Sequence, residues 1–289
     1  FFYLFSLYYV SEFRGPKTSH SCFFGPENAV KHALRFCPRK SKRKEIKTVM
    51  LTVMKFGGSS VADLAHIRNV AQRCIEKQQA GSQVVVVLSA MGKTTDGLIA
   101  TAKQITEKPS RREMDMLLAT GEQVSVSLMA ITMIQMGVSA VSLNAWQVPM
   151  HTTSDYQNAR FKRIDTERIR KELDDNKIVI VTGFQGINKY DDITTLGRGG
   201  SDTTAVALAA FLHADLCRIY TDVDGVYDRD PRLHPDAVKY GRISYDDMLL
   251  LARGGARVLH DRCIELARRE HVMLEVCSAF SDAPGTIVG

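Results

Sequence analysis

Apolar and polar residues alternate with two different periods along this chain from about Met50 onward. Continuous apolar runs rich in β-branched residues predict buried strands at 51–56, 84–88, 138–143, 177–182 and 216–221. Apolar residues spaced by three and four predict helices at 62–79, 98–105 and 114–135, and the alanine-rich stretch after Asp202 has helical composition. Strands that alternate with helices indicate right-handed crossovers, so we expect an α/β fold with a mainly parallel sheet and helices on both faces.

The C-terminal part continues with two helices and a strand. Ser244-Tyr-Asp-Asp resembles a capping box and predicts a helix to about Arg253, where Gly254-Gly255 ends it. A second helix is predicted up to about Glu270, and the apolar residues at 272–276 predict a last strand.

Polar loops that contain glycine follow several of the predicted strands. They lie at 55–60, 89–96, 183–186 and 221–227. The carboxyl ends of parallel strands meet at one edge of a sheet, so we expect these loops to form a binding crevice together.

The segment 194–206 is the strongest functional signal in the chain. Gly197, Gly199 and Gly200 let the backbone approach a ligand closely, and they precede a predicted helix whose first amides favour an anion. Ser201 is expected to be the N-cap residue of that helix, and Arg198 adds a guanidinium suited to a carboxylate or phosphate. A plain glycine turn before a capped helix would need neither Arg198 nor Asp202.

Two common phosphate-binding motifs do not fit. Gly92-Lys93-Thr94 resembles the end of a Walker A loop, but Val87 stands where that loop needs a glycine. A dinucleotide fingerprint starting at Gly197 would need a third glycine, and Asp202 stands there. Any nucleotide is therefore bound in another way.

Charge and cysteine content exclude several classes of function. The net charge of +6 comes from residues 1–49, which hold ten Lys and Arg against three Asp and Glu, whereas the remainder holds 28 against 29. No basic surface for nucleic acid is therefore expected outside that segment. The six cysteines form no Cys-x-x-Cys pair and the eight histidines no cluster with them, which indicates free thiols and no zinc site.

Residues 1–49 are excluded from the predicted fold. They are interpreted as a basic and aromatic extension, with a natural start near Met50 or Met54; a targeting or surface-binding arm is the alternative. No apolar run reaches the ~20 residues needed to span a bilayer, so no membrane partner and a cytoplasmic location are expected.

The loop residues suit phosphoryl transfer, which depends on positioning and charge neutralisation. Lys55 beside Gly57 and Gly58 suits a phosphate, although a solvated lysine after a strand is the simpler alternative. Asp202 can orient a lysine or hold Mg²⁺ through water, or it is only a favourable charge at a helix start. Thr221, Asp222 and Tyr227 are candidates for the adenosine of a nucleotide and Arg232 for its phosphates, although Asp230-Pro-Arg is also an ordinary turn.

Six motifs in order resemble the aspartate kinase (aspartokinase) family of the amino-acid kinase superfamily. They are Lys55-Phe-Gly-Gly-Ser-Ser-Val, Val87-Leu-Ser-Ala-Met-Gly-Lys-Thr-Thr-Asp, Leu118-Ala-Thr-Gly-Glu-Gln, Gly183-Phe-Gln-Gly, Thr195-Leu-Gly-Arg-Gly-Gly-Ser-Asp-Thr-Thr-Ala and Tyr220-Thr-Asp-Val-Asp-Gly-Val-Tyr. The resemblance covers residues 50–289 and implies an αβα sandwich. It also implies the reaction of ATP with L-aspartate to give 4-phospho-L-aspartate and ADP, the first step towards lysine, threonine and methionine.

The resemblance also implies roles for individual residues. Catalysis would depend on Lys55 and Asp202, with ATP and Mg²⁺ as cofactors and no metal held by the protein alone. The aspartate site would consist of Thr95, Glu122, Arg198, Gly199, Gly200 and Ser201, with Arg198 on a carboxylate and Glu122 on the α-amino group. The ATP site would consist of Lys55, Phe56, Gly57, Gly58, Ser59, Ser89, Thr221, Asp222, Tyr227, Arg232 and Arg257.

Two features depart from the family pattern. Arg257 and Asp261 stand where many relatives have Lys and Pro. The sequence stops at Gly289, before the paired ACT domains of full-length relatives, so we expect regulation to be missing or supplied by a separate subunit. A homodimer is the other assembly considered. Rival functions are an acetylglutamate, glutamate or nucleotide kinase of the same superfamily, and a non-catalytic nucleotide-binding subunit.

Overall fold

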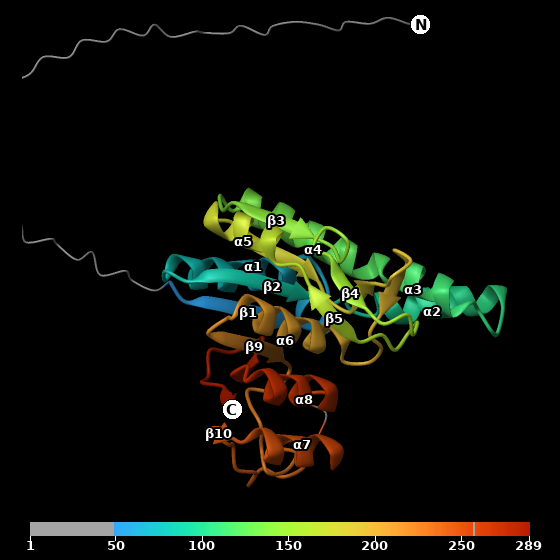
Figure 1. Cartoon of the computed structure of the whole chain (residues 1–289). Coiled ribbons are helices and arrows are strands. Elements are labelled where there is room, and N and C mark those ends of the chain that lie inside the picture. The colour runs from blue at the N-terminus through green and yellow to red at the C-terminus, as the bar shows by residue number, and fades with distance from the viewer. Residues whose placement is uncertain (1–48, 257) are drawn as a thin grey trace, which may run out of the picture. The chain divides into compact units, whose positions relative to one another are not determined.

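The computed structural model describes residues 49–256 and 258–289, and the fold below refers to those residues (Figure 1). The predictions made for residues 1–48 and for Arg257 lie outside them. The described residues belong to one compact unit, 47–289.

An eight-stranded sheet forms the centre of this unit, in the order β10-β12-β11-β9-β1-β2-β6-β3. Its strands are β1 (Leu51–Phe56), β2 (Gln83–Leu88), β3 (Ala140–Leu143), β6 (Ile178–Thr182), β9 (Leu216–Thr221), β10 (Arg242–Ile243), β11 (Leu274–Ser278) and β12 (Thr286–Val288). All neighbouring strands are parallel except β11 and β12. The predicted mainly parallel sheet is therefore confirmed, and β1 lies in its interior between β2 and β9.

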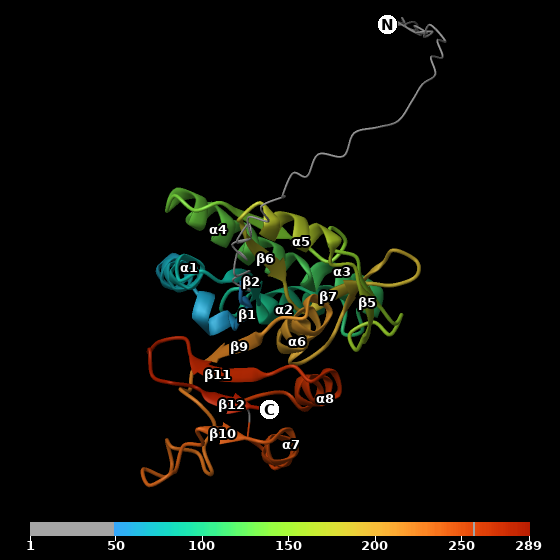
Figure 2. The ribbon, with the colours of Figure 1, turned by 60° about the vertical axis from the view of Figure 1, so that its left-hand side comes forward.

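Helices cover both faces of the sheet (Figure 2). They are α1 (Leu64–Gln79), α2 (Thr94–Ile105), α3 (Arg111–Leu118), α4 (Thr120–Gln135), α5 (Glu167–Asp174), α6 (Gly200–Leu212), α7 (Tyr245–Arg253) and α8 (Asp261–Glu270), with a short 3₁₀ helix, η1, at Gly58–Val61. Along β2, Val85 and Val87 pack with α5 to α8, whereas Val84, Val86 and Leu88 pack with α1 and α4. This alternation fills a core on each face, so the expected αβα sandwich is confirmed.

A second sheet of four short strands was not predicted. It has the order β5-β4-β7-β8, formed by β4 (Met150–Thr152), β5 (Phe161–Ile164), β7 (Gln185–Ile187) and β8 (Ile193–Thr195). Strands of three or four residues carry too few positions to show a period, and α5 was missed for a similar reason. The glycine-rich segment therefore follows β8, a strand of this second sheet.

The N-cap prediction for α6 is wrong. The cap residue is Gly199, with φ 68°, and no side chain caps the helix. Only glycine suits this position, because its backbone is left-handed and a Cβ would lie 2.4 Å from Cγ of His260. Ser201 is the second residue of the helix, two positions after the cap, so its hydroxyl is available for another partner. At α7 the predicted cap is confirmed, because the Ser244 hydroxyl accepts from Asp247 N at 3.1 Å.

One stretch among the described residues, Arg111–Gln135, is long and apolar enough to cross a membrane by length and composition alone. Half of its apolar window is buried inside the protein. It comprises α3 and α4, and it carries the buried acidic residues Asp115 and Glu122. These properties are those of a core helix pair.

The cysteines among the described residues, Cys74, Cys217, Cys263 and Cys277, are free and buried, which confirms the predicted thiols for these four. Burial raises the pKa of the Cys277 thiol to about 12, so it stays protonated at neutral pH. These side chains therefore pack as small hydrophobic residues. Cys22 and Cys37 lie outside the described residues.

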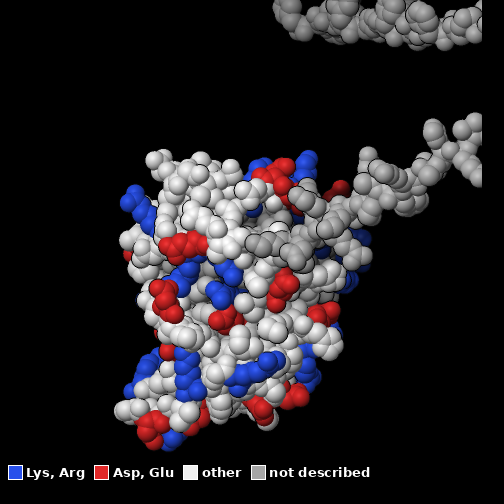
Figure 3. Space-filling model, turned by 90° about the vertical axis from the view of Figure 1, so that its left-hand side faces the viewer, with Lys and Arg blue, Asp and Glu red and all other residues white. Residues whose placement is uncertain are grey.

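Charged side chains of both signs are interspersed on the face that Figure 3 shows. Lys and Arg there stand beside Asp and Glu, and no extended area of that face carries one sign. This distribution agrees with the near-neutral composition of residues 50–289.

Candidate active site

A cavity of about 860 Å³ opens where β1, β2 and β8 end and α6 begins. Many of the residues singled out from the sequence line it: Lys55, Gly57, Gly58, Ser89, Thr95, Glu122, Arg198, Gly199, Gly200, Ser201 and Asp202. The structure therefore brings together the glycine loops at 55–60 and 89–96 with the glycine-rich segment that precedes α6, and Phe184 contributes from the loop at 183–186. The loop at 221–227 does not line this cavity.

Lys55 and Asp202 form an ion pair inside the cavity, with 2.6 Å between Nζ and Oδ1. Their side chains are only 12% and 14% exposed, so water screens the pair weakly. Lys55 lies near the end of the interior strand β1, and Asp202 lies in the first turn of α6. A phosphate bound here would meet the ammonium group of Lys55 together with the amide groups that begin α6.

Gly58 allows the loops after β1 and β2 to touch. A Cβ at this position would lie 2.7 Å from the carbonyl oxygen of Ala90, and Gly92 N donates to Gly58 O at 3.0 Å. A side chain would push the two loops apart and open the phosphate end of the cavity.

Ser201 links the start of α6 to the end of β2. The Ser89 hydroxyl donates to the Ser201 hydroxyl at 2.9 Å, and Ser125 in turn donates to Ser89 O at 2.9 Å. The contact depends on Gly183, where a Cβ would lie 2.6 Å from Ser201 Oγ. Both serines are therefore held in position by neighbouring groups.

Glu122 is a buried carboxylate with one oxygen left for a ligand. Its side chain lines the cavity although the residue is only 3% exposed. Oε1 accepts from Ala90 N at 3.0 Å, and Oε2 has no hydrogen-bond partner within the part of the chain that the structure describes. Burial raises the pKa of Glu122 to about 7. A ligand ammonium group beside Oε2 would supply the missing partner and favour the ionised form.

Three further basic residues and one acidic residue, Asp96, line the cavity. Arg198 is exposed and lines it, as do Lys103 and Arg111. Within residues 49–256 and 258–289, Arg198 forms no ion pair, so its guanidinium group is open to a carboxylate ligand.

Four of the residues assigned to the nucleotide, Thr221, Asp222, Tyr227 and Arg232, do not line the cavity. Thr221 ends β9, which pairs with β1 so that Phe56 faces Tyr220, and Asp222 follows it. Tyr227 donates to Asp224 at 2.8 Å, and Arg232 pairs with Asp230 at 2.9 Å. Thr221 and Asp222 therefore lie at the expected sheet edge, whereas the side chains of Tyr227 and Arg232 are bonded to acidic residues of their own loop.

Three further residues assigned to ATP stand apart. The Phe56 side chain is fully buried and stacks on Tyr220, with 4.3 Å between ring centroids, so only its backbone faces the nucleotide side. Ser59 is exposed in η1 and does not line the cavity. Arg257 lies outside the described residues.

This sandwich, with a lysine and an aspartate paired at the carboxyl edge of a parallel sheet, defines a class of kinase. The Amino acid kinase family matches residues 50–278, and the chain belongs to that family.

Several named proteins are similar to most of this chain. An aspartokinase of Geobacillus stearothermophilus is 56% identical over 238 residues, which cover 82% of this chain and 58% of that protein. The crystal structure of aspartate kinase from Synechocystis has a TM-score of 0.75 at 48% identity, covering 82% of this chain and 39% of the other. E. coli aspartokinase III in complex with aspartate and ADP has a TM-score of 0.74 at 28% identity, covering 82% and 64%. The chain thus spans little more than half of the length of its curated relatives.

Proposed function

We propose that this chain is the catalytic part of an aspartate kinase, which transfers the γ-phosphoryl group of ATP to the β-carboxylate of L-aspartate. One observation carries the proposal: a single cavity holds the Lys55–Asp202 pair together with Glu122 and Arg198. The first pair suits the transferred phosphoryl group, and the second pair suits the two charged groups on the α-carbon of an amino acid. The aspartokinase names among the relatives support the same substrate.

These residues would act mainly through electrostatic interactions. The β-carboxylate of aspartate is ionised at neutral pH, so the attacking oxygen needs no general base. Lys55 would neutralise charge on the phosphoryl oxygens during transfer, and Asp202 would hold the Lys55 ammonium group in place. Arg198 and Glu122 would fix the acceptor, leaving its side chain directed towards Lys55.

Mg²⁺ is proposed to enter with ATP. This ion is commonly held by substrate phosphates, water and one or two carboxylates, and it neutralises charge on the phosphates when bound. Asp202 fits this use because it lies in the cavity at the first turn of α6. Its carboxylate would hold the ion through water while keeping Lys55 oriented.

A coupled assay of ADP release with L-aspartate, ATP and Mg²⁺ tests the proposal. Aspartate is expected to be the preferred acceptor among aspartate, glutamate, acetylglutamate and UMP. Turnover of another acceptor but not of aspartate would assign the chain to a different kinase of the family. Equilibrium binding of ATP without turnover of any acceptor would instead indicate a non-catalytic nucleotide-binding subunit.

The remaining assignments are part of the same proposal. Thr95, Gly199, Gly200 and Ser201 line the acceptor side of the cavity, and Thr221, Asp222, Tyr227 and Arg232 are assigned to ATP. A cytoplasmic location and an assembly as a homodimer or with a separate regulatory subunit are proposed with them. Size measurements in solution, with and without ligands, test the assembly.

A further inference from the structure

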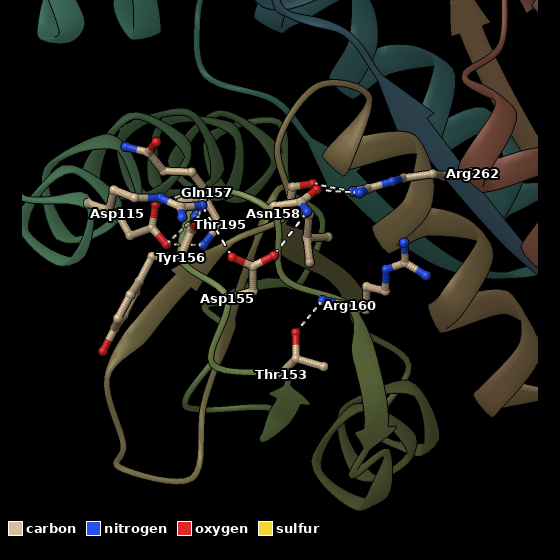
Figure 4. Close-up of polar contacts among 11 residues, drawn as sticks. Asp115, Thr153, Asp155, Tyr156, Gln157, Asn158, Arg160, Thr195 and Arg262 are labelled. Carbon is tan, nitrogen blue, oxygen red and sulfur yellow. Dashed lines mark hydrogen bonds and ion pairs between the residues drawn. The ribbon is translucent and has the colours of Figure 1, made fainter.

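Asp115 is a buried acidic residue that the proposed chemistry does not use. It lies in α3, is 0% exposed and does not line the cavity. Its Oδ2 accepts from Gln157 N at 3.0 Å and from Thr195 N at 2.8 Å, and its Oδ1 accepts from the Thr195 hydroxyl at 2.7 Å (Figure 4). One carboxylate therefore joins α3, the β4–β5 loop and β8, which are far apart in the sequence.

Both partners of Asp115 belong to the cavity wall. Gln157 has a left-handed backbone, with φ 65°, which costs a residue with a Cβ free energy. Its carbonyl oxygen lies where a Cβ of Gly197 would approach to 2.8 Å, and Ala159 N donates to Thr195 O at 3.0 Å. The bond from Asp115 to Gln157 N thus stabilises a strained turn that packs directly on the glycine-rich segment.

Further contacts fix the main chain just before Arg198. Leu196 N donates to Phe184 O at 2.9 Å, and Leu196 O accepts from Arg262 at 3.0 Å. Together with the bond from Thr195 N to Asp115, these contacts hold the main chain just before Gly197. The backbone that carries Arg198 is therefore positioned before any ligand binds.

We propose that Asp115 is a positioning residue for the acceptor site. Its carboxylate holds residues 195–197 against the β4–β5 loop and thereby places the guanidinium group of Arg198. This inference rests on the proposed function, which assigns Arg198 to the acceptor. Because Asp115 bonds to neither Lys55 nor Asp202, its loss should weaken acceptor binding and leave the ATP side unchanged.

The central test is Asp115→Asn, whose amide oxygen can still accept from the two main-chain N–H groups, but which loses the negative charge and the oxygen that accepts from the Thr195 hydroxyl. We expect the KM for aspartate to rise about tenfold, as when a buried hydrogen bond to a charged group is lost. The KM for ATP and kcat should stay within about twofold. Hydrogen–deuterium exchange should accelerate at residues 195–200.

Asp192→Asn is the matched control. Asp192 accepts from the Tyr156 hydroxyl at 2.8 Å and pairs with Arg112, so it supports the same loop from outside the cavity. This variant should leave both the KM for aspartate and the exchange of residues 195–200 as in the wild type. If both variants slow turnover and raise both KM values alike, the role of Asp115 is general stability and the proposal is overturned.

Thr195→Val keeps the test decisive if Asp115→Asn does not fold, because it removes only the hydroxyl donor. We expect a rise of about threefold in the KM for aspartate, with unchanged KM for ATP, as when one hydrogen bond is lost. In the double variant the two effects should be less than additive, since both act on one contact. An unchanged KM for aspartate in either folded variant overturns the proposal.

The outcomes also separate this inference from the proposed function. A wild-type chain that does not phosphorylate aspartate overturns the proposed function. In that case the positioning role of Asp115 is tested with the acceptor that the chain does use. The KM for that acceptor and the hydrogen–deuterium exchange of residues 195–200 are then compared between Asp115→Asn and the wild type. An active wild type with unchanged exchange in Asp115→Asn overturns the inference alone.

Discussion

The two sides of the candidate active site differ in how their side chains are held. On the proposed acceptor side, Glu122, Thr195 and Arg198 line one cavity, where Glu122 accepts from Ala90 N and Thr195 N donates to Asp115. On the proposed nucleotide side, the side chains of Tyr227 and Arg232 bond to Asp224 and Asp230 of their own loop. On the first side, polar groups still lack partners that a ligand could supply. On the second side, the polar side chains already have partners within the protein.

This difference has an energetic consequence. Glu122 keeps an unpartnered buried oxygen, which costs free energy that a bound ammonium group would recover. Arg232 must give up its pairing with Asp230 before it reaches a phosphate, so the net gain is smaller. We therefore expect substitutions on the acceptor side to change ligand affinity more than equivalent substitutions around Arg232.

The Lys55–Asp202 pair lies between the two sides, and removing it should have the largest effect. Lys55→Ala and Asp202→Ala should each lower kcat by about 10²–10³-fold, the usual loss when a preorganised charge is removed from a transition state. Steady-state assays measure this, with circular dichroism to check folding. Lys189→Ala, an exposed lysine outside the cavity, is the control. Near-wild-type turnover in either variant would contradict the assignment.

Arg198→Ala should have the next largest effect, and on the acceptor side alone. We expect the KM for aspartate to rise about 10- to 100-fold through loss of a charged hydrogen-bond partner, with kcat changed less. Arg198→Lys should recover only part of the affinity, because an ammonium group cannot form the paired contact. A raised KM for ATP with an unchanged KM for aspartate would move Arg198 to the nucleotide side.

Glu122→Gln should change affinity and stability in opposite directions. We expect the KM for aspartate at pH 8 to rise about tenfold, because the amide cannot pair with the ammonium group. The folded pKa of about 7 lies above the ordinary 4.5, so stability from this group is complete below pH 4.5 and is lost as the pH rises through 7. Glu122→Gln should therefore raise the Tm by a few degrees at pH 8 and change it little at pH 4.5.

The wild type provides the internal check on that prediction. Its KM for aspartate should rise as the pH falls below about 7, where Glu122 becomes protonated, and Glu122→Gln should lack this dependence. A parallel pH profile in the two proteins would show that another group controls acceptor binding.

Arg232→Ala, on the proposed nucleotide side, should have the smallest effect of these substitutions. The Arg232 side chain is 72% exposed and already paired, so we expect the KM for ATP to rise no more than about threefold and the Tm to stay constant. Isothermal titration with ATP measures this directly. A tenfold loss of ATP affinity would show that this loop closes over the nucleotide, and the two sides would then be equally important.

The meeting of the glycine loops at one cavity was predictable from the sequence, because its residues stand beside strong patterns. Gly57 and Gly58 follow a clear strand and Gly199 precedes a clear helix, so their meeting at one edge followed from topology. The second sheet was missed, because β7 and β8 are too short to show a period. With it, the support for Arg198 was missed as well.

Asp115 shows why such support is hard to predict. Its one visible signal is a charged residue within the apolar run Met114-Asp-Met-Leu-Leu, which could have indicated a buried carboxylate. Nothing in the sequence names Gln157 and Thr195 as its partners, because those contacts depend on how the β4–β5 loop and β8 pack. The prediction of the N-cap of α6 was wrong for a similar reason, because the close approach of His260 to Gly199 is a tertiary contact.

The interior place of β1 also has a consequence for how the chain becomes active during folding. β2 follows β1 after only η1 and α1, whereas β9 pairs with β1 across many intervening strands and helices of the sequence. Contacts between residues this distant in sequence form slowly, because a long loop must close first. Lys55 meets Asp202 only once α6, which leads into β9, has docked. The proposed phosphoryl transfer should thus be among the last properties acquired on refolding, and a chain released early from the ribosome would bind no substrate productively.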